Sequence, residues 1–435
     1  MAMVVKNNMS AVSTLNTLNK NSSALAKSLQ KVSSGMKINS AADDASGYAI
    51  SERMRVQIRG LDQANQNTQN GTSMMKVAEG AVSSTVDILK TLKEKVINAA
   101  NDTNTDADRQ TIQKELDQSI DQIDDNANVT YNGKYLVDGS KNTIGSATYT
   151  ALTNQSLSTD TAANSKLTEL KSRSGDALEI ADTDKVTVSY VKGGKTFTTV
   201  FSAKDATINT ILTNANSVGT AFGGSILAGT SVGTATSGAT VYTASGASAI
   251  TFTAATAGVT DQVSALTISI TDKDGNVKKS ANASLDAFTE TVRAQNKSED
   301  NAITLQVGTK ANQSIKVGLT DMRSEALGLK GSDGTKLNIS TQAKANAAIN
   351  VLDNAVQKAL DQQTTIGSVE SRLSYTSSNL TTASENVQSS ESTIRDADMA
   401  KEMTEYTKNN VLLQAAQSML AQANQNSSSV LSLLQ

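Results

Sequence analysis

The chain of 435 residues contains no cysteine, histidine, proline or tryptophan. Without cysteine it can form no disulfides, no thiolate nucleophile and no thiolate metal site. Without histidine it lacks the side chain that most often transfers protons near neutral pH and most often binds transition metals. These absences exclude a histidine-dependent triad, a zinc hydrolase and a histidine phosphotransfer site. The sequence therefore predicts no enzyme, no cofactor and no metal.

Two further scarcities concern shape. An average chain has about 5% proline, so its complete absence favours unbroken helices and folding without slow isomerisation. Aromatic residues make up 3% of the chain. The apolar material is therefore mainly aliphatic, which is typical of helix seams and thin β layers rather than thick cores. The composition predicts an elongated molecule.

Charge and apolar runs exclude two classes of partner. The 39 basic and 42 acidic residues give a net charge of −3, so no basic field attracts nucleic acid or anionic lipid. No run approaches the ~20 apolar residues that span a membrane. The first nine residues lack the apolar core and cleavage site of a signal peptide. We expect no nucleic-acid partner, no membrane insertion, and a chain that is soluble or exported without a cleavable signal peptide.

Both ends of the chain carry apolar residues at alternating steps of three and four, the pattern of a helix seam. The N-terminal set is Leu15, Leu18, Leu25, Leu29 and Val32, and the C-terminal set is Leu413, Ala416, Leu420, Ala423, Val430 and Leu434. Each seam is a narrow stripe that needs another helix to cover it. We predict that the two ends pair with each other.

That terminal pair is expected to be weak in a single chain. The flanking Asn, Ser, Thr and Lys residues are mediocre helix formers. Each buried leucine contributes about 1.5–3 kcal/mol, whereas ordering roughly 70 residues costs about 1–2 kcal/mol apiece. We predict that the ends are disordered in the monomer and fold when neighbouring copies cover their remaining apolar faces.

Helical spacing extends inward from both ends. It runs from about Ser10 to Asn126, with breaks at Ser33–Gly35 and 101–108, and the S-x-x-D pattern at Ser40 predicts a helix start. From about Thr341 it resumes, and the alternation from Ile366 to Ile394 predicts a coiled-coil helix packed on residues 54–123. A break is expected within 395–410.

The middle of the chain changes to period-two spacing. Residues 186–190 and 195–201 predict a hairpin, followed by a helix near Ile208. Residues 266–270 and 276–281, followed by a helix through Leu285, Phe288 and Val292, predict a second β-β-α unit of the same plan. The tract 217–259, rich in small residues, is either thin β structure or a flexible loop.

Three motifs suggest chemistry and are better explained as local structure. Gly194-Lys195-Thr196 lacks the glycine that a phosphate loop needs at position 189, so we interpret it as a turn. Residues 272–275 lack the glutamate and glycine spacing of a calcium loop, and we interpret them as a hairpin turn. Asp43 and Asp44 suit helix capping better than catalysis.

The motifs at the two ends resemble those of bacterial flagellin, the subunit of the flagellar filament. They are Ser33-Ser-Gly-Met-Lys-Ile-Asn-Ser-Ala-Ala-Asp-Asp44, Gly60-Leu-Asp-Gln-Ala-Asn65, Glu79-Gly-Ala81, Tyr131-Asn-Gly133, Ile394-Arg-Asp-Ala-Asp398, Leu420-Ala-Gln-Ala-Asn424 and Val430-Leu-Ser-Leu-Leu434. Residues 304–308 and 315–319 resemble the hairpin of short flagellins. The resemblance covers about the first 140 and the last 130 residues.

The resemblance implies a mainly α fold with a β-rich insertion. Residues 1–40 and 398–435 would form an inner-tube coiled coil, and 41–141 with 303–397 an antiparallel helical shell rod with a β-hairpin. Residues 142–302 would form a surface-exposed α+β variable domain, built of the two β-β-α units.

The resemblance also implies partners and location. The chain would self-assemble into an extracellular helical filament for swimming, beside hook-junction and cap proteins. It would leave the cell unfolded through a type III channel, with an export chaperone bound at Leu413 to Leu434. A filament-junction or cap-type protein is the alternative. A flagellin with a zinc protease in its insertion is disfavoured, because histidine and cysteine are absent.

Flagellins are also ligands of a host Toll-like innate receptor, through a helix motif resembling L-Q-R-V-R-E-L-A-V. The corresponding stretch here runs from Leu89 to Ile97, with Thr91 where the family has arginine. The candidate contacts are Leu89, Thr91, Glu94, Ile97, Gln113 and Glu115. Because a hydroxyl cannot replace the bidentate pairing of a guanidinium, we predict weak receptor signalling.

Overall fold

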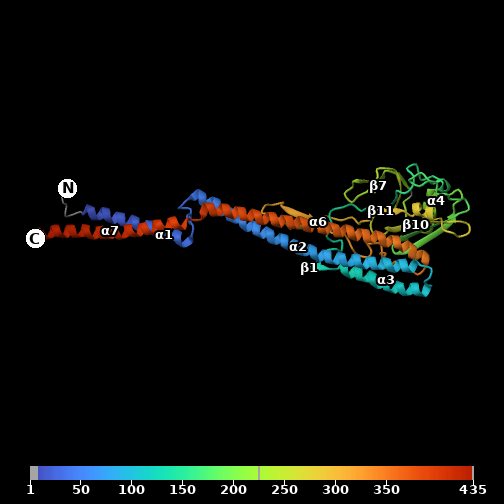
Figure 1. The fold of residues 1–435 in the computed structure, drawn as a ribbon, viewed down its shortest axis with the longest axis horizontal. Coiled ribbons are helices and arrows are strands. Elements are labelled where there is room, and N and C mark those ends of the chain that lie inside the picture. The colour runs from blue at the N-terminus through green and yellow to red at the C-terminus, as the bar shows by residue number, and fades with distance from the viewer. Residues whose placement is uncertain (1–7, 224–225, 434–435) are drawn as a thin grey trace. The chain divides into compact units, whose positions relative to one another are not determined.

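The computed structural model describes residues 8–223 and 226–433 (Figure 1). Half of the fold is carried by a few long helices, and short strands occupy the middle of the chain. The helices are α1 (Met9–Ser34), α2 (Ala45–Ala100), α3 (Asp106–Ala127), the short 3₁₀ turn η1 (Leu167–Glu169), α4 (Ile208–Val218), α5 (Lys279–Leu285), α6 (Gln342–Arg395) and α7 (Met399–Leu433). The predicted breaks at 33–35, 101–108 and within 395–410 are confirmed.

The strands form small antiparallel sheets. They are β1 (Thr130–Tyr131), β2 (Lys134–Tyr135), β3 (Ala151–Asn154), β4 (Lys185–Lys192), β5 (Lys195–Ser202), β6 (Leu227–Gly229), β7 (Ser231–Thr234), β8 (Thr240–Tyr242), β9 (Ala249–Thr253), β10 (Val263–Thr271), β11 (Phe288–Val292), β12 (Ile303–Gln306) and β13 (Ser314–Val317). Strands β6 to β9 resolve the 217–259 tract in favour of thin β structure among its described residues.

The described chain divides into two compact units. The terminal unit contains the described residues up to Asn67, with Val307–Gln313 and the described residues from Tyr375 onward. The central unit contains Thr68–Gln306 and Ser314–Ser374. The described residues of 142–302, expected from the sequence to form a variable domain, lie in the same compact unit as α3, the part of α2 from Thr68 onward and the part of α6 up to Ser374.

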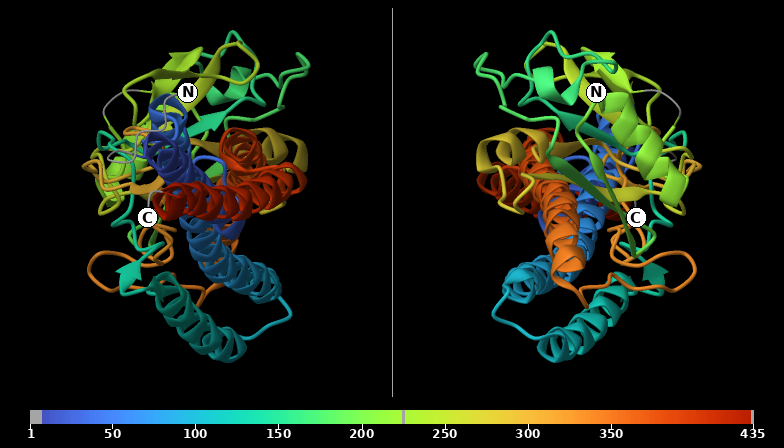
Figure 2. Two further views of the ribbon diagram at one scale, coloured as in Figure 1. Left: turned by 90° about the vertical axis from the view of Figure 1, so that its left-hand side faces the viewer. Right: turned by 90° about the vertical axis from the view of Figure 1, so that its right-hand side faces the viewer.

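In the central unit, α2 lies between α3 and α6 (Figure 1), and ion pairs link it to both neighbours, Lys95 to Glu115 and Lys93 to Asp353. Both views of Figure 2 place α3 on the side of α2 that faces away from the β-rich part. The buried layer of these helices is aliphatic: Val82, Val86, Leu89, Leu92, Val96, Leu116, Ile120, Ile123, Val351, Leu352 and Ile366.

The predicted long seam of α6 is confirmed. From Ile366 to Ile394 the apolar positions at alternating steps of three and four are buried or half-buried, and only Ser390 of that series is exposed. Leu373 has no exposed surface. The pattern could be predicted because a helix seam depends on local spacing alone.

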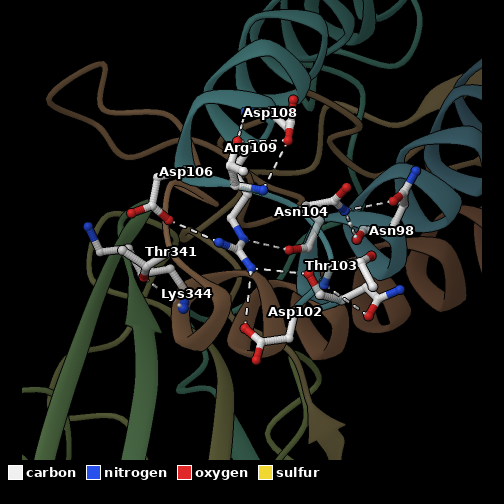
Figure 3. A network of polar contacts seen from close by, with 12 residues as sticks. Asn98, Asp102, Thr103, Asn104, Asp106, Asp108, Arg109, Thr341 and Lys344 are labelled. Carbon is white, nitrogen blue, oxygen red and sulfur yellow. Dashed lines mark hydrogen bonds and ion pairs between the residues drawn. The ribbon is translucent and has the colours of Figure 1, made fainter.

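The turn between α2 and α3 is built around one buried guanidinium, that of Arg109 (Figure 3). Its Nε donates to Ala99 O at 2.9 Å, Nη2 to Asn101 O at 3.1 Å, and Nη1 to Asp106 Oδ1 at 2.9 Å. Carbonyls at the end of a helix have no partner within it. Arg109 supplies donors at the α2 end and joins that end to the first turn of α3.

The β-rich part packs two sheets around a small core. One sheet has the order β10-β4-β5 and the other β11-β3-β9-β6, with α4 and α5 completing the core. Most of the chain's few aromatic rings gather here. Tyr190 stacks on Phe197 and meets Phe222 edge-on, and Phe222, Phe252 and Phe288 continue the series.

The predicted first β-β-α unit is confirmed as β4, β5 and α4. The second is wrong beyond its first strand β10. Residues 276–281 form no second strand beyond a bridge between Thr271 and Val277, α5 comes early, and Phe288–Val292 is strand β11. Strand β10 pairs with β4, so both units share one sheet.

The predicted helix start at Ser40 is displaced. Asp43 Oδ2 accepts from Ser40 N at 3.0 Å and closes a turn, but α2 begins at Ala45. Asp44 caps that helix, accepting from Ser46 N and Gly47 N at 3.0 Å each. Both aspartates therefore have the hydrogen-bonding roles favoured from the sequence. The turn interpretations of residues 193–194 and 272–275 are confirmed as well.

Candidate assembly surface

The terminal unit contains an antiparallel pair of helices, α1 and α7, which lie side by side (Figure 1). Asn8 begins α1, because its side chain accepts from Ala11 N at 3.0 Å. Gly35 ends it in the left-handed conformation, at φ 72°, which glycine adopts without strain. The two ends of the chain therefore pair with each other, as the heptad spacing predicts.

The surface that α1 turns toward α7 differs from the predicted stripe. Its less exposed positions alternate by three and four: Ala11, Thr14, Leu18, Asn21, Leu25, Ser28 and Val32. On α7 they are Glu402, Tyr406, Asn409, Leu413, Ala416, Leu420 and Ala423. Small and polar residues make up more than half of these positions, so the pair buries little apolar area.

The predicted seam residues separate into three groups. Leu18, Leu25, Val32, Leu413 and Leu420 are half-buried in the pair. Leu15 and Leu29 lie outside it, with 45% and 52% of their surface exposed. The side chain of Val430 lies outside the described part, as does the whole of Leu434. Leu15 and Leu29 lie outside the contact because Thr14, Asn21 and Ser28 occupy the α7-facing positions of α1 instead.

Large apolar side chains remain exposed on several faces of the two paired helices. They are Met9, Val12, Leu15 and Leu29 on α1, and Met399, Met403, Val411, Leu412 and Met419 on α7. Single exposed apolar residues are normal on a protein surface, and nine large ones on two paired helices exceed that pattern. These nine residues are together called the apolar row below.

Sequence reasoning missed the polar contacts of the pair. Asn21 Nδ2 donates to Leu412 O at 3.2 Å, and Asn409 Nδ2 donates to Ser28 Oγ at 3.0 Å. Lys31 pairs with Glu402 at 3.4 Å. Polar residues such as Asn21 and Ser28 occur at seam spacing among the leucines. That spacing could have predicted these contacts, but a search for apolar residues alone does not detect it.

A second missed feature joins the ends of the long helices inside the terminal unit. Arg395, at the end of α6, is 5% exposed and its Nη1 contacts Glu52 Oε1 at 2.7 Å. The guanidinium also lies over the ring of Tyr48, 5.5 Å from its centroid, within the range of a cation–π contact. This hydrogen bond lowers the pKa of Glu52.

The residues proposed as host-receptor contacts all lie in the central unit. Thr91, Glu94 and Ile97 are exposed on one side of α2, and Ile97 has 51% of its surface accessible. Leu89 has no exposed surface, so it cannot contact another protein in this fold. Leu89 matches the leucine of the receptor motif in spacing, but that position of α2 faces the buried layer between the helices.

The other two proposed contacts lie on α3 and have partners within the chain. Gln113 Nε2 donates to Leu337 O at 2.8 Å, and its Oε1 accepts from Ile339 N at 2.7 Å. Gln113 thus holds the segment 337–339 beside α3. Glu115 is exposed and pairs with Lys95 at 3.1 Å.

Buried ionisable groups occur where the β-rich part meets α6. Glu290 of β11 has a side chain that is 12% exposed, and burial raises its pKa to about 7 despite the nearby charges of Lys358 and Arg293. Lys358 of α6 is buried, donates to Ala326 O at 2.6 Å, and has its pKa lowered by burial. Arg293 also pairs with Asp361 at 2.7 Å.

Family models match the sequence at both ends of the chain. Residues 5–142 match the model of the bacterial flagellin N-terminal helical region, and residues 349–434 match that of the C-terminal helical region. The solved flagellar hook associated protein-3 from Legionella pneumophila aligns with 78% of this chain and 97% of its own, at 13% identity and a TM-score of 0.33.

Curated relatives match nearly the whole length. The chain is 35% identical over 424 residues to a flagellin from Clostridium tyrobutyricum, covering 97% of this chain and 99% of that protein. It is 30% identical over 452 residues to a flagellin from Bacillus subtilis (strain 168), covering 99% and 100%. With family models matched at both ends and relatives aligned throughout, the chain belongs to the bacterial flagellin family.

Proposed function

We propose that this flagellin enters the filament through the apolar row, the side chains that its α1–α7 pair leaves uncovered. Membership of the family makes the chain a structural subunit of the flagellar filament. The observation that carries the finer proposal is the exposure of Leu15 and Leu29, two of the residues that the heptad spacing selected. Head-to-tail contacts of this kind do not close and therefore generate helical polymers.

Energetics support a coupling of folding to assembly. The intramolecular contact of α1 and α7 contains asparagine, serine and threonine in place of further leucines. Covering each exposed leucine in a neighbouring copy would contribute about 1.5–3 kcal/mol. The segments of α1 and α7 are then disordered in the monomer, and they order as copies stack around them.

Hydrogen exchange tests this coupling. We expect amides of residues 10–32 to exchange rapidly in dilute monomer and slowly in filaments. Amides of α2 around Val86, which lie in the buried central helices, serve as the internal reference. Strong protection of residues 10–32 in the dilute monomer would contradict the coupling.

Seeded polymerisation tests the role of the apolar row itself. The double variant Leu15→Ser, Leu29→Ser removes two exposed leucines and leaves the α1–α7 contact unchanged. Losing about 3–6 kcal/mol per subunit should raise the critical concentration at least about a hundredfold. The matched control is Ile144→Ser, which removes a side chain that is 72% exposed in the β-rich part. Equal critical concentrations in the two variants would refute the proposal.

The apolar row also supplies a surface for an export chaperone. Residues from Leu413 onward include Met419, which is 62% exposed, and the half-buried Leu420. A chaperone bound here would prevent polymerisation until the unfolded chain passes through a type III channel. Met419→Ser, Leu420→Ser should abolish a one-to-one complex with a flagellar export chaperone in native mass spectrometry. Unchanged binding would contradict this assignment.

Host-receptor signalling is proposed to be weak. Thr91 Oγ1 donates to Asp87 O at 3.0 Å within α2. A receptor would therefore meet no guanidinium at this position, and the hydroxyl that stands there already has a hydrogen-bond partner. The buried Leu89 offers no contact. Thr91→Arg should increase potency in a reporter-cell assay, with Thr111→Arg on α3 as the control. Nanomolar potency of the unmodified protein would overturn the proposal.

A further inference from the structure

One sheet of the β-rich part ends in a strand whose outer edge is open. Strand β5 is the last of the order β10-β4-β5 and is 8 residues long. The turn Gly193-Gly194 pairs Lys192 with Lys195, and the ladder to β4 continues from there without a register shift. In an antiparallel ladder, every second residue bonds to the partner strand and the others point their N–H and C=O groups away from it. The outward residues of β5 are Thr196, Thr198, Val200 and Ser202.

These outward groups are available for pairing. Beyond the strand, Ala203 N donates to Asp184 O at 2.8 Å, which continues the same alternation. Among the residues that the structure describes, the outward N–H and C=O groups of β5 form no hydrogen bond. Thr198 is exposed, and Val200 has 59% of its surface accessible. The described chain therefore leaves this edge of the sheet uncovered.

The opposite edge of the same sheet is closed. On β10, Ile270 N donates to Asn282 Oδ1 at 2.6 Å, and Ser264 O accepts from Asn354 Nδ2 at 2.9 Å. A bulge interrupts the ladder near the start of β10. Proteins protect strand edges by such coverage, by bulges, by proline and by charge, because an open edge pairs with other chains. Strand β5 has no bulge and no proline, and Lys195 is its only charged residue.

A second β5 fits this edge. If a two-fold axis passes through Thr199, each outward N–H of one strand faces an outward C=O of the other, and up to about eight hydrogen bonds can form. Phe197 then lies opposite Phe201 of the second copy. Both rings are only partly buried at the margin of the core, and cross-strand aromatic pairs stabilise a sheet. Lys195 lies opposite an alanine, so no like charges oppose each other.

We infer that β5 is a strand-addition surface, at which a second copy of this chain pairs through its own β5 in antiparallel orientation. The contact uses the same surface twice and closes on two copies, so it differs from the head-to-tail contacts that build a polymer. Two short strands bury less than the roughly 1,600 Å² of a standard interface. The pair is therefore weak and is favoured where chains are concentrated, as in a filament. This inference does not rest on the apolar row.

A matched pair of charge variants tests the contact, because Thr198 would lie opposite Val200 of the second copy. Thr198→Lys, Val200→Lys sets lysine against lysine, whereas Thr198→Lys, Val200→Glu sets lysine against glutamate. Both side chains are exposed, so neither variant alters the core. In sedimentation equilibrium of the unseeded full-length chain, we expect the unmodified protein to dimerise. The dissociation constant of the lysine–lysine variant should exceed that of the lysine–glutamate variant at least about tenfold.

Engineered cysteines report the register, because the chain has no cysteine of its own. Thr199→Cys lies on the two-fold axis, where the two Cα atoms would be about 4.5 Å apart, within the range of a disulfide. The control Ser202→Cys would lie about 20 Å from its copy, at 3.4 Å per residue. Thr199 is half-buried and Ser202 is exposed, so random collision favours the control. We expect a disulfide-linked dimer from Thr199→Cys only.

Three results would overturn the inference. The first is an equal dissociation constant for the two charge variants, and the second is a disulfide that forms as readily from Ser202→Cys as from Thr199→Cys. The third is a chain that stays monomeric at every accessible concentration, which would assign the open edge to a different protein. The variant Leu15→Ser, Leu29→Ser should form the same β5 dimer. Loss of the dimer in that variant would assign it to the terminal helices instead, whereas failure of the apolar row proposal would appear as normal polymerisation of the same variant.

Discussion

The carboxyl group of Glu290 makes the central unit less stable as the pH rises. It lies on β11, against α6, with a side chain that is 12% exposed. Burial raises its pKa from 4.5 to about 7, against the lowering effects of Lys358 and Arg293. The folded state therefore holds a proton that the unfolded chain releases near pH 4.5. Stability is greatest below the unfolded pKa and is lost as the pH rises through the folded one.

The size of the effect follows from the shift in pKa. Each pKa unit corresponds to 1.36 kcal/mol, so a shift of roughly 2.5 units amounts to about 3 kcal/mol between pH 4.5 and 8. Asp286, whose pKa is raised to about 6 mainly by burial, changes stability in the same direction. The free energy of unfolding of the neutral variant Glu290→Gln should therefore increase relative to that of the unmodified chain as the pH rises.

The assay is chemical denaturation followed by the fluorescence or ellipticity of the central unit, between pH 5 and pH 8. The control is Glu299→Gln, which neutralises an exposed carboxyl group nearby. We expect the difference in unfolding free energy between Glu290→Gln and the unmodified chain to grow with pH, and that of the control to stay constant. Parallel pH profiles for all three proteins would refute the reasoning.

Three other substitutions test local features. Leu373→Ala removes a side chain with no exposed surface and should cost about 2–5 kcal/mol in denaturant unfolding; a cost below 1 kcal/mol would contradict the buried seam. Gly35→Ala places a Cβ on a residue with φ of 72°, where no other atom lies within 4 Å. Backbone strain alone should therefore cost about 1–2 kcal/mol, which would be seen as faster amide exchange at the end of α1 in filaments. Arg109→Met leaves Ala99 O and Asn101 O without their donor and should cost about 2–4 kcal/mol. An unchanged unfolding midpoint would show that water replaces the guanidinium.

Features that depend on local spacing could be predicted from the sequence. The alternation from Ile366 to Ile394 determines a seam whichever helix covers it. The Asn132-Gly133 turn joins β1 and β2 with positive φ at both residues, as such a dipeptide favours. Short-range rules suffice for these elements because the residue pattern that specifies each one lies within a single segment.

Features that depend on distant partners could not be predicted. Leu285, Phe288 and Val292 have helical spacing, but Phe288–Val292 becomes strand β11 because β3 lies beside it as a partner. The ladder joins residues more than a hundred positions apart, so no local signal distinguishes strand from helix. The burial of Leu89 depends in the same way on the neighbouring helices.

The terminal seams show where an apolar pattern misleads about a single chain. Leucine spacing on α1 identified Leu15 and Leu29 as seam residues, whereas the structure turns Asn21 and Ser28 toward α7. Rules for hydrophobic burial assume that a chain buries its apolar residues against other residues of the same chain. A subunit of a polymer has a second set of partners, which the sequence of one copy does not distinguish from the first.

Seeded polymerisation of a chain lacking residues 1–34 and 399–435 tests the central claim most directly. This deletion removes α1 and α7, and with them the apolar row, while the central unit retains its own core. The account predicts that the shortened chain remains folded by circular dichroism and does not elongate seeds at any accessible concentration. Filament growth at the rate of the full-length chain would contradict it.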